Sequence, residues 1–146
     1  MKNLIILIGL ILSINCFGQA GKTVQLMGEV TINGNESALL KSGRMSQTNG
    51  FIGIDVVWDT TAITAGTGYI IAKASLFDYD SAFQWKTLTT VDYSVYTGIN
   101  DTMTVSSKGS NMWGISGLPF DYVGVYIKGA VGDTFTVKAY YVGKEY

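Results

Sequence analysis

Residues 122–141, YVGVYIKGAVGDTFTVKAYY, hold the clearest folding signal in this chain. Apolar residues occupy every second position on both sides of a Gly129–Gly132 turn. Alternation with a period of two is the pattern of a strand that buries one face. The predicted inward rows are Val123, Val125 and Ile127 before the turn and Phe135, Val137, Ala139 and Tyr141 after it. We therefore expect two strands joined as a hairpin.

The same alternation recurs upstream in two further segments. Phe51–Trp58 places Ile52, Ile54, Val56 and Trp58 on one face. Tyr69–Phe77 places Ile70, Ala72, Ala74 and Leu76 on one face. Each segment is bounded by glycine-rich or polar residues, as expected for half-buried strands between tight turns.

The N-terminal part of the domain carries a hairpin signal of its own. Thr23–Ile32 is rich in β-formers, and Asn33-Gly34 follows it directly. Both turn residues tolerate a positive φ, so the chain is expected to return as a paired strand over Glu36–Lys41. Further short strands are expected around Trp85, at Tyr93–Tyr96, at Thr102–Ser107 and at Asn111–Ile115.

These segments together predict an all-β fold. No window of the chain after residue 20 repeats apolar residues at helical spacing, and short strands recur along its length. We predict one antiparallel two-sheet β-sandwich of jelly-roll type, with about eight strands, over residues 21–146. The Cys–Trp–Cys pattern of antibody domains is absent, so an immunoglobulin module is not expected.

Composition supports a folded chain without a nucleic-acid partner. Of 146 residues, 47% are hydrophobic and 14% charged, which is far from the composition of disordered chains. The formal net charge is -1, and no run of basic residues is present to bind a phosphate backbone. We therefore expect no nucleic-acid binding.

The first 20 residues read as a cleavable signal peptide. Met1-Lys2-Asn3 is a positive start, and Leu4–Ile14 is apolar but short for a mature membrane span. Cleavage is predicted before Gln19 or before Gly21. The chain is then secreted or displayed at the cell surface, with no stable membrane span after processing. Two alternatives remain at this stage: acylation of Cys16 as a lipoprotein, and a retained N-terminal anchor.

The sequence has few of the side-chain types that enzymes commonly use for catalysis. The chain has no histidine, and its one cysteine, Cys16, lies in the leader, so imidazole and thiol catalysis are excluded and no cofactor is expected. The remaining catalytic option is a carboxylate pair, with Asp55 and Asp59, or Asp78 and Asp80, as the nearest candidates. We predict that the protein is not an enzyme.

Asp78 and Asp80 are also the candidates for a calcium site. Carboxylate oxygens suit Ca²⁺, but the twelve-residue spacing of a specific calcium loop is missing. An ordinary turn, in which aspartate bonds the local backbone, is the expectation, and no metal is predicted.

Aromatic side chains give the candidate binding residues. Tyr126 and Tyr140 fall on the outward rows of the two C-terminal strands. If those strands pair, the two rings form an exposed strip for stacking on sugars or packing against another subunit. Trp58 and Tyr141 fall on inward rows and are predicted to belong to the core.

Several sequence features resemble a known class of modules. They are Gly66-Thr67-Gly68, Trp85 after an aspartate-rich turn, Leu118-Pro119-Phe120, Gly132-Asp133-Thr134 and the Tyr141–Lys144 ending. In this order they resemble the small β-sandwich accessory modules of bacteriophage virions, such as head-decoration and fibre subunits. The resemblance implies a structural, assembling protein without catalytic residues, at the virion surface if the protein is phage-encoded.

The leader qualifies that resemblance. Virions assemble in the cytoplasm, where an export signal has no use, and Phe17-Gly18-Gln19 is similar to the ends of signal peptides in Bacteroidota. We therefore expect an exported structural or adhesive subunit that associates with itself or with another structural protein. The alternative is a secreted carbohydrate-binding module. The sequence places the expected self-pairing edge at Thr134–Val142.

Overall fold

The computed structural model describes residues 23–45, 51–63, 68–88, 94–96, 102–116 and 120–143. The predicted leader, with Cys16 and both cleavage sites, lies outside the described residues. The strands are β1 (Thr23–Asn33), β2 (Ser37–Lys41), β3 (Phe51–Ala62), β4 (Tyr69–Ser75), β5 (Lys86–Thr87), β6 (Ser94–Tyr96), β7 (Thr102–Thr104), β8 (Gly109–Ser116), β9 (Tyr122–Lys128) and β10 (Thr134–Gly143). One 3-10 helix, η1 (Ala82–Gln84), precedes β5.

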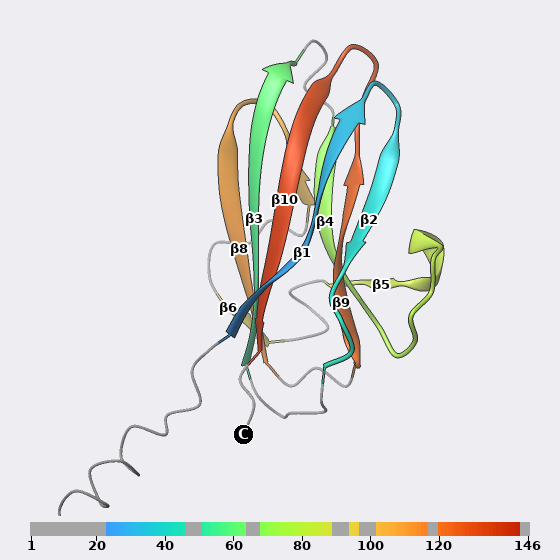
Figure 1. The fold of residues 1–146 in the computed structure, drawn as a ribbon, viewed down its shortest axis with the longest axis vertical. Coiled ribbons are helices and arrows are strands. Elements are labelled where there is room, and N and C mark those ends of the chain that lie inside the picture. Colours follow the sequence, from blue (N-terminus) through green and yellow to red (C-terminus); the bar gives the residue numbers. More distant parts are fainter. Residues whose placement is uncertain are drawn as a thin grey trace, which may run out of the picture.

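The strands form two antiparallel sheets that face each other (Figure 1). Sheet A has the order β1-β10-β3-β8-β6, and sheet B has the order β2-β9-β4-β5, with β7 also paired to β4. The strands pair from the two ends of the sequence toward its middle: β1 with β10, β2 with β9, β3 with β8, and β4 with β7. This is the strand order of a jelly-roll, a long hairpin rolled up into two sheets. The predicted fold class is confirmed.

The core lies between the sheets and contains the predicted inward rows. Its fully buried side chains include Ile54 and Val56 of β3, Ile70 of β4, Val123, Val125 and Ile127 of β9, and Phe135 and Val137 of β10. Trp58 and Tyr141 are also buried, as predicted. Leu76 is the exception, because β4 ends at Ser75 and the Leu76 side chain is exposed.

Both predicted hairpins are wrong in the same way. β1 lies in sheet A and β2 in sheet B, and β9 lies in sheet B and β10 in sheet A. Each turn therefore crosses from one sheet to the other instead of joining two neighbouring strands. We call a turn that crosses between the two sheets an arch. An arch and a hairpin present the same alternating rows of side chains to the core, so the pattern of apolar residues does not distinguish them.

The two arches pack side by side at one end of the sandwich. The amide of Gly34 donates to the carbonyl oxygen of Asp133 at 2.8 Å, and the amide of Gly129 donates to that of Glu36 at 2.9 Å. Gly34 has a φ of 57°, in the left-handed region that glycine adopts without strain. Gly129 lies against the backbone of Gly34, where a Cβ has no room. Glycine is thus favoured at Gly34 by its backbone conformation and required at Gly129 by the close approach of the two arches.

β10 is a central strand, with β1 on one side and β3 on the other. The prediction that Thr134–Val142 is a free pairing edge is therefore wrong, and β1 is the edge strand on that side of sheet A. In the described part of the chain, no helix has the length and hydropathy needed to cross a membrane.

Candidate functional surfaces

The outer face of sheet A carries a row of four side chains in register across four strands. Leu26 of β1 pairs with Tyr140 of β10, Tyr140 with Asp55 of β3, and Asp55 with Met112 of β8. We call Leu26, Tyr140, Asp55 and Met112 the apolar row. Leu26 is 59% exposed and Met112 is 62% exposed, whereas Tyr140 and Asp55 between them are partly buried. Two large apolar side chains thus flank a phenol and a carboxylate on an open sheet face.

A β-bulge sets which residue of β1 joins this row. The register with β10 shifts between Leu26 and Gly28, so Met27 is the extra residue. Outward positions on β1 are Glu29 and Thr31 on one side of the bulge and Leu26 on the other. Without the bulge, Met27 would face outward and Leu26 inward, because a shift of one residue exchanges the two faces of a strand.

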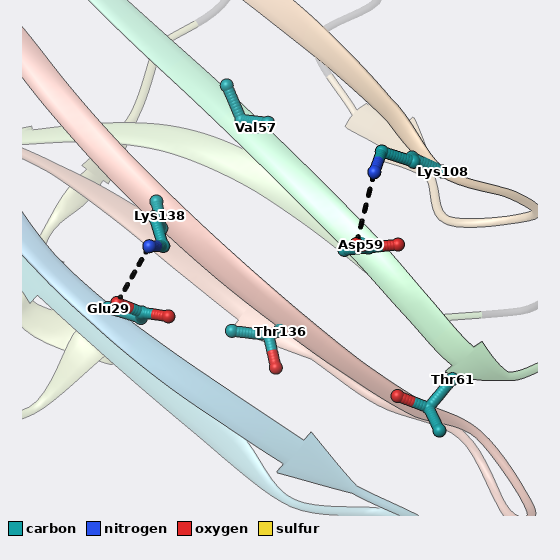
Figure 2. Close-up of a pocket in the computed structure, with 7 residues that line it drawn as sticks. All are labelled: Glu29, Val57, Asp59, Thr61, Lys108, Thr136 and Lys138. Carbon is teal, nitrogen blue, oxygen red and sulfur yellow. Dashed lines mark hydrogen bonds and ion pairs between the residues drawn. The ribbon is translucent and has the colours of Figure 1, made fainter.

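Next to the apolar row lies a shallow groove of about 410 Å³ on the same face (Figure 2). Two ion pairs form its sides. The Nζ of Lys138 lies 3.1 Å from Oε2 of Glu29, and the Nζ of Lys108 lies 3.1 Å from Oδ2 of Asp59. The groove is also lined by Val57, Thr61 and Thr136, and the Thr136 hydroxyl is 2.9 Å from that of Thr31. Across the sheet the charged residues are, in order, Glu29, Lys138, Asp59 and Lys108, so their charges alternate in sign.

The outer face of sheet B has a different chemistry. Tyr126 of β9 and Tyr69 of β4 lie with ring centroids 6.1 Å apart and planes tilted by 56°. The Nζ of Lys73 is 5.6 Å from the centroid of the Tyr126 ring. Burial lowers the pKa of the Lys73 ammonium, and burial together with Tyr126 raises the pKa of the Tyr69 phenol. Tyr126 thus belongs to a small cluster of two rings and one cation.

The segment from Leu76 to Trp85, which we call the excursion, stands out from sheet B between β4 and β5 (Figure 1). Trp85 anchors it. The indole of Trp85 is buried, its Nε1 donates to the carbonyl oxygen of Tyr79 at 2.9 Å, and its ring packs edge-on to Tyr122 with centroids 6.5 Å apart. The Nζ of Lys73 adds a hydrogen bond of 3.3 Å to the Trp85 carbonyl oxygen.

The excursion exposes apolar side chains of its own. Phe83 is 97% exposed, and Leu76 and Phe77 are also exposed. Phe77 contacts Tyr79 edge-on, with centroids 5.7 Å apart. This second apolar surface lies on the sheet B side of the sandwich, away from the apolar row.

The structure separates the two predicted binding tyrosines. Tyr126 and Tyr140 point outward, but from β9 in sheet B and from β10 in sheet A. The prediction of one aligned strip is wrong, because the strands that carry the two rings do not pair. Each tyrosine instead belongs to a separate surface, Tyr140 to the apolar row and Tyr126 to the sheet B cluster.

Asp78 and Asp80 come together around a side-chain cation. The Nζ of Lys41 lies 2.6 Å from Oδ1 of Asp78 and 3.1 Å from Oδ1 of Asp80. Hydrogen bonds to these carboxylates raise the pKa of Lys41. The lysine ammonium thus lies between the carboxylates that were the calcium candidates.

Asp55 and Asp59 lie on one strand and do not face each other. Both point outward from β3, and a separation of four residues corresponds to about 13 Å along a strand. Asp59 pairs with Lys108, and Asp55 lies in the apolar row between Tyr140 and Met112.

Sequence reasoning missed Leu26, Met112 and Phe83. A signal for Met112 was available, because Trp113 and Ile115 face inward and Met112 alternates with them. The bulge at Met27 conceals Leu26 from any such alternation. Phe83 lies in η1, where no strand pattern applies.

No protein-family model matches this chain, and no curated protein or solved structure matches it either.

Proposed function

We propose that this protein is a non-catalytic structural or adhesive subunit, exported or displayed at a surface, that works by protein–protein assembly. The observation that carries the proposal is the apolar row. Leu26 and Met112 are more than half exposed at the two ends of a row whose centre is Tyr140. Tyrosine and methionine are enriched in protein interfaces, and aligned apolar side chains on an exposed sheet face suit a partner better than solvent.

Two observations on the side chains considered for catalysis support the non-catalytic part of this proposal. Histidine is absent from the whole chain, and the carboxylates that sequence reasoning singled out are held in ion pairs or spaced along one strand. The partner is proposed to be the protein itself or another structural protein. A location outside the cytoplasm, or on a virion if the gene is phage-borne, is part of the proposal. The predicted leader and the resemblance to virion modules support it.

Light scattering tests assembly directly. The full 146-residue chain is produced in a Gram-negative host, and its intact mass is measured to define the species purified. Its average particle mass is then followed over a wide concentration range at low and high salt. We expect a defined oligomer at high concentration. A monomer under every condition, together with no binding to other exported structural proteins of the source, contradicts the proposal.

A carbohydrate-binding module is the second candidate, and the sheet B cluster favours it. Tyr126, Tyr69 and Lys73 offer rings and a hydrogen-bond donor on one outer face. Because Tyr126 and Tyr140 lie on opposite sheets, a glycan array now separates the surfaces. Saturable binding that Tyr126→Ala abolishes and Tyr140→Ala leaves intact selects this candidate over assembly.

A further inference from the structure

The apolar row has an order that is complementary to itself. From β1 to β8 it reads Leu26, Tyr140, Asp55, Met112: an apolar group, a hydroxyl donor, a carboxylate acceptor and an apolar group. Turned end for end, the row places apolar against apolar at both ends. In the middle it places the donor against the acceptor.

A two-fold axis produces this reversal. If the axis lies parallel to the strands, between β10 and β3 and in the plane of contact, β1 of one copy faces β8 of the second and β10 faces β3. Leu26 then packs on Met112 of the second copy, and the Tyr140 hydroxyl donates to Asp55 of the second copy. Two-fold interfaces are isologous, so each contact occurs twice.

The charged side chains of the groove are also complementary to the same row in reversed order. Across the sheet they run Glu29, Lys138, Asp59, Lys108, which is negative, positive, negative, positive. The reversed order sets Lys138 of one copy toward Asp59 of the other, and Glu29 toward Lys108. A lysine side chain spans the one-row offset between them. The two ion pairs within each chain thereby extend into a network between the chains, and opposite charges meet across the contact.

We propose that the partner of this face is a second copy of the same chain, packed sheet A against sheet A about this two-fold axis. The proposal rests on the proposed function and names its partner and interface. The face is large enough: nine residues of β3 by four strands span about 30 Å by 19 Å. Side-chain relief raises this area toward the ~800 Å² per partner of a standard interface. Two twisted sheets that pack face to face commonly keep their strand directions within about 30° of each other, which this arrangement allows.

Reciprocal substitutions test the contact. Leu26→Lys and Met112→Asp each place a charge against an apolar side chain and are expected to raise the dimer dissociation constant by at least about tenfold. Combined in one chain, they bring the two introduced charges together across the interface, and dimerisation is expected to return. Within one chain the two positions are three strands, about 14 Å, apart, so they cannot pair internally. Both are exposed, so the fold tolerates the changes.

Phe83→Lys is the matched control, because it makes the same kind of exchange at an exposed apolar position on the excursion. It is expected to leave the dissociation constant unchanged. A double variant no better than the single variants, or dimerisation lost on Phe83→Lys instead, overturns this interface while the chain still assembles. A wild-type chain that stays monomeric at all concentrations overturns the interface and removes self-assembly from the proposed function.

Discussion

The indole of Trp85 lies over Gly124 on the outer face of sheet B, and a Cβ on Gly124 would lie 3.1 Å from Cζ3 of Trp85. Gly124 falls on the outward row of β9 between Tyr122 and Tyr126, so its missing side chain leaves a notch in the sheet surface. Trp85 fills that notch and is buried there. The excursion is therefore anchored on the outside of the sandwich, and not in the core between the sheets.

Gly124→Ala is expected to loosen this anchor. The added methyl group crowds the indole and the carbonyl oxygen of Leu40, which lies 2.9 Å from the same position. Overpacking of this kind costs about 1–3 kcal/mol of unfolding free energy. Urea unfolding measures the loss, and proteolysis within residues 76–85 reports the release of the excursion. Gly43→Ala is the control, since a Cβ there meets only the Tyr141 hydroxyl at 3.5 Å. Equal effects of the two substitutions would remove the role assigned to Trp85.

Lys41 gives the excursion a second attachment that depends on pH. Its bonds to Asp78 and Asp80 raise its pKa above the usual 10.5. A raised lysine pKa means that the stabilisation is complete below about pH 10.5 and is lost as pH rises through the folded-state value. The stability difference between the wild type and Lys41→Met should thus be constant up to about pH 10 and shrink above it. Urea unfolding over this range decides the point, and a difference that grows with pH contradicts it.

Lys73 is expected to show the opposite dependence. Burial lowers its pKa below 10.5, so the charged form is disfavoured in the folded state. Stability should rise as pH increases through the folded-state pKa toward 10.5, because the cost of burying the ammonium disappears. Lys73→Met should remove this rise. Paired unfolding curves of Lys73→Met and the wild type at about pH 8 and about pH 10.5 measure it, with Lys86→Met, an exposed lysine of β5, as the control.

The cleavable signal peptide stays a prediction, and a measurement of the intact mass tests it. On expression in a Gram-negative host, cleavage is expected before Gln19 or Gly21. Intact mass spectrometry distinguishes these products. A mass that includes diacylglycerol on Cys16 identifies a lipoprotein instead, and an uncleaved chain supports a retained anchor.

Sequence alone determined the core side chains that β3, β9 and β10 contribute. Ile54 and Val56, like Val125 and Ile127, were assigned inward from alternation and are fully buried. This information is local, because a strand sends successive side chains to opposite faces whatever it pairs with. The jelly-roll class followed from many short alternating segments without helical spacing.

Only the tertiary structure decided which sheet each strand joins. A turn such as Asn33-Gly34 can lead to a neighbour about 4.8 Å away or to the facing sheet about 10 Å away, and both choices bury the same residues. Here the chain crosses to the facing sheet at both predicted hairpins. Tyr126 and Tyr140 are parted for that reason, and β10 becomes a central strand.

The apolar row depends on the tertiary structure in the same way. Leu26 faces outward because a bulge at Met27 shifts the alternation of β1, and it meets Tyr140, Asp55 and Met112 because four strands far apart in sequence align in register. Neither the bulge nor the register can be inferred from the alternation of apolar and polar residues along a single strand. Both are fixed by the pairing of backbone hydrogen bonds across the sheet, which involves residues more than a hundred positions apart, such as Leu26 and Tyr140.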